Sequence, residues 1–222
     1  MFPRYNVVDA IRVDIERLDP DDLPSLPVLM QALKRSGETA QSILTQPPSS
    51  DIAADAMRQE RHRFEAFLDS WSRSPTAESQ PLAYRRVLST EEALAWWTRV
   101  AQRWDVTAKS WYPMLARPVP AEVVVLHDRA MRDGPGPAAL RSALGQLGRH
   151  RVVELREYGP EYALALDLLD PGYNGAEGLW TDDTLDWIAF ASHEGTIAFG
   201  GSVTPLLPTL WPDLEGARWS GW

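Results

Sequence analysis

The sequence has 222 residues, no cysteine and a formal net charge of −9. A chain of this length can bury most of its apolar surface without covalent crosslinks, and the lack of cysteine excludes disulfides, thiolate metal sites and cysteine nucleophiles. Residues 151–222 contain 12 of the 31 acidic residues and 3 of the 22 basic ones, which accounts for the entire net charge. This imbalance argues against nucleic-acid binding there and favours either a basic partner or a solubilising surface.

Three helices are expected in the N-terminal third of the chain. Apolar residues recur at helical spacing from Tyr5 to Leu18, which favours a helix, although Ile11, Val13 and Ile15 also alternate as in a strand. Ser25 is placed to cap a second helix, with Gly37 as its terminator, and Ser50 begins the longest helical pattern. The apolar face of this third helix comprises Met57, Phe64, Phe67, Leu68 and Trp71.

The segment from Ser74 to Pro81 is small and polar and contains two prolines, which is typical of a linker. We therefore expect a helical N-terminal region in residues 1–80 and an α+β domain in residues 81–222. The charged opening of the chain is typical of neither a signal peptide nor a membrane span, so we expect a cytoplasmic protein that does not contact a membrane.

The second region begins with a short predicted strand from Tyr84 to Leu88, followed by a helix that reaches about Asp105. Ser89 and Glu92 have the spacing of a capping box at the start of this helix. Its predicted apolar stripe comprises Leu94, Trp97, Val100, Ala101 and Trp104. The following Trp111–Pro113 segment could lie at the rim of a pocket or fill the core, and the sequence does not decide between these.

Strands dominate the rest of the chain. The apolar run Glu122–His127 has strand length, and it precedes a helix with Leu140, Leu144 and Leu147 on one face. The remaining predicted strands are 152–158, 161–169, 186–191 and 196–200. Ser192–Gly195 fits a hairpin loop with glycine last. The overall prediction is an α+β fold, with an N-terminal helical portion packed with a C-terminal, mainly antiparallel sheet of about five strands.

Common catalytic motifs are absent from the sequence. There is no phosphate-binding glycine loop of the P-loop or dinucleotide type, no H-E-x-x-H zinc motif and no G-x-S-x-G nucleophile motif. No cofactor or metal is therefore expected.

His193 and Glu194 are the candidate catalytic residues. An imidazole oriented by a carboxylate can transfer protons near neutral pH, and Asp182, Asp183 and Asp186 lie close by in sequence. His127 and Asp128, at the end of another predicted strand, could supply a distant partner. The alternative interpretation is a polar turn in which His193 or Ser192 bonds to the backbone.

Partner recognition is the other hypothesis for this region. Aromatic residues bury a large area at low entropic cost, and carboxylates select a basic partner. The residues predicted to bind the partner are Tyr173, Trp180, Asp182, Asp183, Asp186 and Glu194. Trp187 belongs to the same stretch, but it could equally be a core residue.

Several segments together carry a resemblance to a known kind of protein. They are LSTEEALAWW, SWYPM, ELREYGPEY with the following LALDLLD, and DWIAFASHEGTIAFGG before WPDLE, and the resemblance covers about Tyr84 to Trp219. This combination resembles an uncharacterised bacterial α+β protein family with a DWxxxxSHEGxxxFGG motif, and it is similar to small immunity proteins that neutralise polymorphic toxins. The resemblance implies a non-enzymatic cytosolic interaction protein that binds a basic partner protein through an acidic, aromatic C-terminal face. A hydrolase or metal-dependent enzyme using His193 and Glu194 is the alternative.

Overall fold

A computed structural model describes residues 2–40, 48, 50–73, 83–116, 121–132 and 134–221, with side chains from residue 6 onward. The chain divides into two compact units, Met1–Arg86 and Val87–Trp222. The predicted linker Ser74–Pro81 lies outside the described residues.

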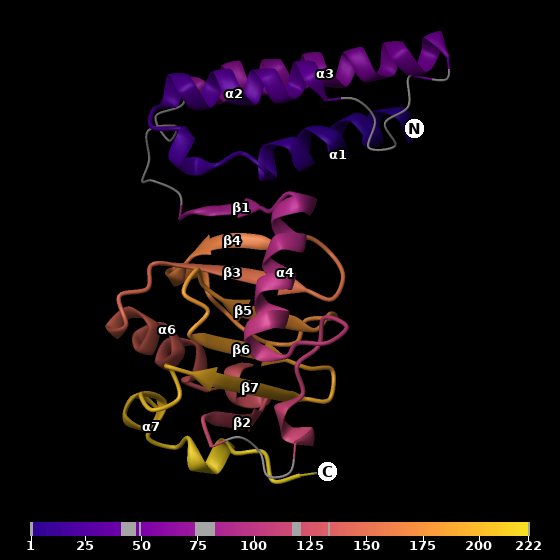
Figure 1. Cartoon of the computed structure of the whole chain (residues 1–222). Coiled ribbons are helices and arrows are strands. Elements are labelled where there is room, and N and C mark those ends of the chain that lie inside the picture. Colours follow the sequence, from indigo (N-terminus) through magenta and orange to yellow (C-terminus); the bar gives the residue numbers. More distant parts are fainter. Residues whose placement is uncertain are drawn as a thin grey trace. The chain divides into compact units, whose positions relative to one another are not determined.

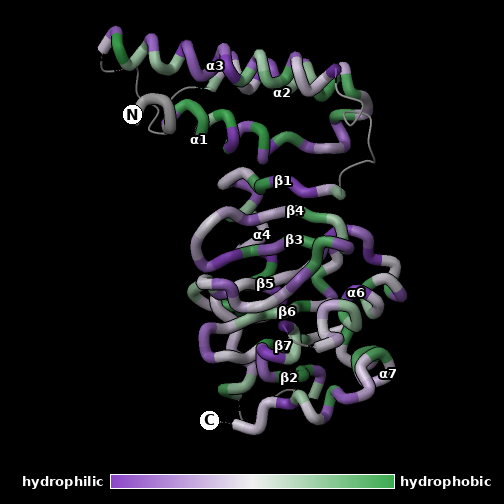
Figure 2. The backbone as a smooth tube through the Cα atoms, turned by 180° about the vertical axis from the view of Figure 1, so that it is seen from behind, coloured by the Kyte–Doolittle hydropathy of each residue, from purple (hydrophilic) through white to green (hydrophobic). Residues whose placement is uncertain are grey.

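The N-terminal unit consists mainly of α1 (Phe2–Glu16), α2 (Leu26–Thr39) and α3 (Asp51–Ser72), with a short 3-10 turn at Pro20–Asp22. Ser50 caps α3 by accepting a hydrogen bond from the Ala53 amide at 3.2 Å. Figure 2 shows hydrophobic and hydrophilic residues alternating along α3, as expected for an amphipathic helix. Val7, Ile11, Ala40 and Met57 form the buried core of the unit.

Two expectations for these helices were wrong. Gly37 does not end α2, which continues to Thr39. A Cβ atom at Gly37 would lie 2.8 Å from Cδ1 of Phe64, so this glycine permits close packing of α2 against α3. Phe67, predicted to lie on the apolar face of α3, is 62% exposed.

The second unit is built on a seven-stranded sheet with the order β1-β4-β3-β5-β6-β7-β2 (Figure 1). The strands are β1 (Arg85–Val87), β2 (Val123–His127), β3 (Arg151–Arg156), β4 (Tyr162–Ala165), β5 (Gly178–Thr181), β6 (Trp187–Ala191) and β7 (Thr196–Gly201). The neighbouring pairs from β4 to β2 are antiparallel. The α+β prediction is therefore confirmed, with seven strands in place of about five.

Helices cover both faces of the sheet. One face packs against α4 (Thr90–Trp104) and the segment after it, including Trp111 and Met114. The other packs against α6 (Gly136–Gln146) and α7 (Leu207–Leu210) (Figure 1). The short helices α5 (Arg129–Arg132), η3 (Pro113–Leu115), η4 (Leu166–Leu168) and η5 (Glu215–Ala217) complete the unit. Because both faces are covered, every residue of β5 and β6 is buried.

The sequence did not predict β5. This strand has only four residues, and all are buried, so it lacks the alternation that marks a half-exposed strand. The predicted strand 161–169 stops early, since β4 ends at Ala165 and a 3-10 turn follows. In that turn Leu168 is 41% exposed, so the apolar residues at every second position from Tyr162 to Leu168 do not form one buried face.

The capping box of α4 is confirmed. The Ser89 hydroxyl accepts from the Glu92 amide at 3.2 Å, and the Glu92 carboxylate accepts from the Ser89 amide at 2.8 Å. The predicted apolar stripe was wrong at Leu94, which is 62% exposed. Trp96, which the stripe omits, packs against the core instead.

Gly200 and Gly201 at the end of β7 make room for two tryptophans of the α4 face. A Cβ atom at Gly200 would lie 2.9 Å from Trp111 and 3.1 Å from Trp104. Gly201 has φ +79°, and a Cβ atom there would lie 2.1 Å from the carbonyl oxygen of Asp186. The two indole rings meet edge to face at 5.9 Å. The glycine pair of the FGG segment thus has a packing role.

Among the described helices, none is long and apolar enough to cross a membrane.

Candidate functional site

One end of the sheet gathers loops from distant parts of the chain. Gly178 pairs with Ala191, and His127 pairs with Thr196. The residues just outside these pairs, Glu177, the Ser192–Gly195 turn and Asp128, therefore meet at the same edge. The Asp128 amide donates to the Gly195 carbonyl at 2.8 Å, so the two strand ends considered in the sequence analysis do lie together.

The β6–β7 connection is a tight turn. The Ser192 amide donates to the Thr196 carbonyl at 3.0 Å, and the Gly195 amide donates to the Ser192 carbonyl at 3.2 Å. The Ser192 hydroxyl accepts from the Glu194 amide at 3.0 Å. Gly195 has φ +71°, a conformation that glycine adopts without strain. The turn holds His193 and Glu194 outward.

Glu177 is a buried carboxylate at the centre of this end of the sheet, with a side chain only 4% exposed. It accepts hydrogen bonds from the Ser110 hydroxyl at 2.9 Å, from the Tyr112 hydroxyl, and from Nδ1 of His193 at 2.6 Å. Burial acts to raise the pKa of Glu177, but the hydrogen bonds from Tyr112, Ser110 and His193 together outweigh it, so the pKa lies below its ordinary value. Glu177 is therefore ionised at neutral pH.

Tyr112 stays protonated as the donor to Glu177. Burial, together with the hydrogen bond to the Glu177 carboxylate, raises the pKa of Tyr112 to about 12. Its ring meets Phe190 edge to face at 5.4 Å, which fixes the hydroxyl against Glu177.

His193 lies between two carboxylates. Its side chain is 57% exposed, and Nε2 lies 3.2 Å from the Glu194 carboxylate. The hydrogen bond to Glu177 is the largest cause that raises the pKa of His193, and the charges of Glu177, Glu194 and Glu157 add to it. Because the folded-state pKa is raised, the favourable contribution of the imidazolium is complete below the ordinary histidine pKa and is lost as the pH rises through the raised value.

A turn with two non-glycine residues at positive φ precedes the donors to Glu177. Thr107 and Ser110 exchange both backbone hydrogen bonds, at 3.1 and 2.9 Å. Between them, Ala108 and Lys109 have φ values of 49° and 64°, which glycine and asparagine adopt more readily. Lys109 Nζ donates to the Glu157 carbonyl at 3.2 Å and holds the turn in place.

Replacing Ala108 by glycine is expected to raise the free energy of unfolding by about 0.5–1 kcal/mol, because glycine adopts positive φ without the steric cost of a Cβ atom. Denaturant titration measures this difference. Ala95→Gly is the control, since Ala95 lies exposed within α4 and the substitution there should destabilise by about 1 kcal/mol. Equal destabilisation by both changes would contradict a strained turn.

The predicted site residues Asp182 and Asp186 form a separate network that shapes the β5–β6 turn. Asp182 is 2% exposed and accepts from Trp187 Nε1 at 2.7 Å and from the Thr184 amide at 2.9 Å. Arg149 reaches both acids, with Nη2 at 2.7 Å from Asp186 and Nε at 3.3 Å from Asp182. A single arginine pairs with both carboxylates, so part of their charge is neutralised within the chain, and Asp182 is too buried to contact a partner.

The prediction that Trp180 lies on the binding face was also wrong. It is 1% exposed and belongs to the core between the sheet and α6. A residue buried on a central strand cannot contact a partner, because both faces of the sheet are covered. Trp187 is a core residue as well, as the alternative interpretation held.

Three predicted residues remain at the surface. Asp183 is exposed, and its carbonyl accepts from Arg99 at 2.8 Å. Tyr173 is partly buried, and its amide donates to the carboxylate of Asp128 at 3.3 Å. The Glu194 side chain is 44% exposed beside His193.

Sequence reasoning missed the buried centre of the site. Glu177 lies in a glycine-rich connection that reads as an ordinary loop, and Ser110 and Tyr112 lie more than sixty residues before it. Only the fold brings these residues to His193. The sequence did single out Tyr112, as part of the Trp111–Pro113 segment, but it did not decide whether this segment lies at the rim of a pocket or in the core.

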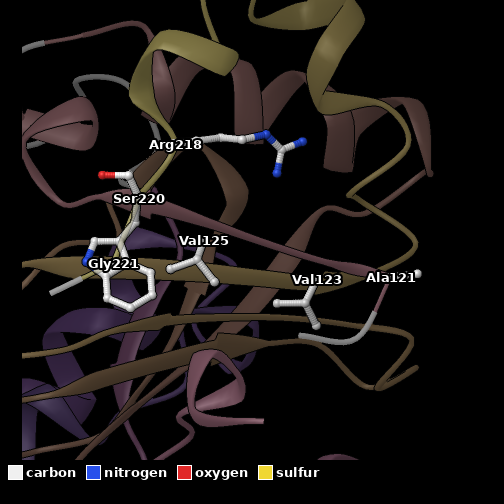
Figure 3. A pocket seen from close by; sticks show the side chains of 7 residues that line it. Ala121, Val123, Val125, Arg218, Ser220 and Gly221 are labelled. Carbon is white, nitrogen blue, oxygen red and sulfur yellow. The ribbon is translucent and has the colours of Figure 1, made fainter. Parts of the chain in front are cut away.

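Two cavities are described on this unit, and neither is lined by His193. The larger, about 600 Å³, lies between the end of α4 and β2, and Ser110 and Tyr112 line part of it. The smaller, about 420 Å³, lies between β2 and the C-terminal segment (Figure 3). There Val123 and Val125 face residues Arg218–Gly221. Within the described residues, no group of three or more histidines and carboxylates is arranged to hold a metal ion.

Comparisons with protein-family models, with curated proteins and with solved structures found no match to this chain.

Proposed function

We propose that this chain is a non-enzymatic interaction protein that binds a basic partner protein at the end of the sheet around His193. The proposed contact area, called here the His193 surface, comprises Glu157, Tyr158, Tyr173, His193 and Glu194. This retains the acidic, aromatic character predicted from the sequence but replaces the buried Trp180 and the paired Asp182 and Asp186.

The buried carboxylate beneath the His193 surface is the single observation that best supports this proposal. Glu177 adds a negative charge that, among the described residues, is met by the hydroxyl groups of Ser110 and Tyr112 and by the amide and the exposed ring of His193. Glu157 and Glu194 add two more carboxylates within electrostatic range of that imidazole. Lys109 lies at the edge of the group, where it bonds to the Glu157 carbonyl. The sum of these charges is negative, which favours a cationic partner.

Two aromatic rings at the surface, one exposed and one partly buried, supply the other half of the argument. Tyr158 is 59% exposed, and Tyr173 lies close enough to influence its hydroxyl. Tyrosine buries a large area at low entropic cost, and its ring accepts guanidinium groups. The chain already stacks guanidinium groups on its own indoles, with Arg99 at 4.2 Å from the Trp96 ring. Cytosolic neutralisation of a basic toxin, as small immunity proteins perform, is a role that such a surface would suit.

Charge reversal tests this function. The double substitution Glu157→Lys with Glu194→Lys should lower the affinity for a blocked hexa-arginine peptide at least about tenfold, which corresponds to about 1.4 kcal/mol. Isothermal titration calorimetry at about 10 mM salt measures it, because charge interactions then act over about 30 Å.

The matched control is Asp167→Lys with Asp170→Lys, which makes the same charge change at two exposed residues outside the His193 surface. We expect this variant to retain most of the affinity. Equal losses in the two double variants, or no binding by the wild type, would reject the proposed surface.

An acid–base enzyme is the second candidate, favoured by the short contact of 2.6 Å between His193 Nδ1 and Glu177. A carboxylate on Nδ1 orients an imidazole and leaves Nε2 as the proton-transfer atom. His193→Gln removes that atom but leaves Glu157, Tyr158 and Glu194. Turnover of chromogenic esters or phosphodiesters by the wild type, lost in this variant, would favour the enzyme over the interaction protein.

A further inference from the structure

We infer that partner binding at the His193 surface is coupled to the loss of a proton from His193. In this view His193 is the internal cation of the site, which the partner's cationic group replaces. The inference concerns regulation of the proposed binding site and rests on that proposed function.

The contacts of His193 favour a protonated ring. Nδ1 lies within hydrogen-bond distance of the Glu177 carboxylate, at 2.6 Å, and Nε2 lies within ion-pair distance of the Glu194 carboxylate, at 3.2 Å. A carboxylate only accepts hydrogen bonds, and the imidazolium carries a proton on both ring nitrogens, whereas the neutral ring would turn an unprotonated nitrogen toward one of the two carboxylates. The arrangement of these residues on the β6–β7 turn therefore favours the charged state.

The two carboxylates differ in how firmly they are held. Glu177 is buried and fixed by the hydroxyl groups of Ser110 and Tyr112. Glu194 is 44% exposed and lies on the turn itself. When His193 loses one proton, the remaining proton stays on Nδ1, because Glu177 provides the shorter and better-anchored acceptor. The Nε2 lone pair then faces the Glu194 carboxylate, and that carboxylate turns toward solvent.

The carboxylates around His193 all favour its charged form. Glu157 follows β3, Glu177 precedes β5 and Glu194 lies on the turn, and all three charges favour the imidazolium. Lys109 opposes them from the edge of the site, where its ammonium lies 3.9 Å from Glu161. Tyr112 contributes no charge below pH 10, since its hydroxyl stays protonated.

A partner's guanidinium group competes with the imidazolium for Glu194 and Glu157. Binding of this group lowers the pKa of His193, because a second positive charge replaces the carboxylate contacts of the ring. By linkage, the affinity for the partner rises with pH and levels off above the His193 pKa of the free protein. Arginine itself keeps its charge throughout this range.

The first experiment follows His193 in the free protein. Nitrogen-15 chemical shifts, assigned by comparison with His193→Gln, report the pKa and the tautomer of the neutral ring. We expect a raised pKa that falls in Glu194→Gln, and a neutral ring protonated on Nδ1. A neutral ring protonated on Nε2 would overturn the assigned roles of Glu177 and Glu194.

The second experiment measures binding of the hexa-arginine peptide from about pH 5 to pH 9. For the wild type, the affinity should rise by up to about tenfold per pH unit below the His193 pKa, which is the limit for release of one proton. In His193→Gln the affinity should vary little over this range. The same rise in both proteins rejects the coupling alone, whereas no binding at any pH rejects the proposed function and the coupling together.

Discussion

Replacing Gly201 by alanine is expected to lower the free energy of unfolding of the second unit by about 3 kcal/mol. Alanine pays a steric cost at φ +79°, and its Cβ atom would meet the Asp186 carbonyl oxygen at 2.1 Å and Trp104 at 2.8 Å. Backbone on one side and an indole on the other leave the methyl group no direction in which to relax. Thermal unfolding followed by near-ultraviolet circular dichroism should show a midpoint lowered by about 2–4 °C for each kcal/mol.

Gly195→Ala separates the cost of the positive φ from the cost of the close contacts. Gly195 also has positive φ, at +71°, but no atom lies within 4 Å of a Cβ built there. This variant should lose only about 1 kcal/mol, the steric cost of the conformation itself. If both variants lose the same amount, the close contact at Gly201 does not contribute to stability.

Replacing Glu177 by alanine is the second large effect that we expect. The change leaves the hydroxyl groups of Ser110 and Tyr112 without their acceptor in a buried position, and it removes the anchor of the His193 ring. The loss in free energy of unfolding should be about 2–4 kcal/mol. The His193 pKa should fall, because the hydrogen bond to this carboxylate is the main reason that this pKa is raised.

Glu177→Gln is the matched control. The amide keeps the size of the side chain and one accepting oxygen, so we expect a smaller loss of stability than for alanine but a similar fall in the His193 pKa. The sign of the pH dependence also follows. Because the pKa of Glu177 is lowered, its contribution is present above the ordinary carboxyl pKa and is lost as the pH falls through the lowered value. In Glu177→Gln this decrease in the free energy of unfolding at acid pH should be absent, because glutamine does not titrate.

Local sequence signals predicted the parts of the fold that depend on local chemistry. The capping box at Ser89 and Glu92 and the glycine turn at Gly195 both form as expected, because each is decided within four residues. The strand β5 was missed because complete burial removes the periodicity on which strand prediction depends. Gly37 looked like a helix terminator, but its role is set by Phe64, which lies on another helix.

The candidate site was predictable only at its exposed tip. His193 and Glu194 stand out in sequence as adjacent polar residues in a turn, and the structure places them together at the surface. Their buried partner Glu177 and its donor Tyr112 are 65 residues apart, and nothing local marks Glu177 as buried or pairs it with Tyr112. Trp180 and Asp182 fail as surface residues for the converse reason, since polarity and aromatic character do not reveal that both faces of β5, and the residue that follows it, are covered.

The position of β2 at the edge of the sheet has a consequence for synthesis of the chain on the ribosome. β2 ends at His127, whereas β7, the strand beside it in the described sheet, begins at Thr196. Trp104 and Trp111 likewise emerge well before the glycine pair on which they pack. The three N-terminal helices make contacts with one another that are closer in sequence and can form early. In the second unit, an apolar strand and two indoles lack these native partners until Gly201 has been translated, so their native burial comes late in synthesis.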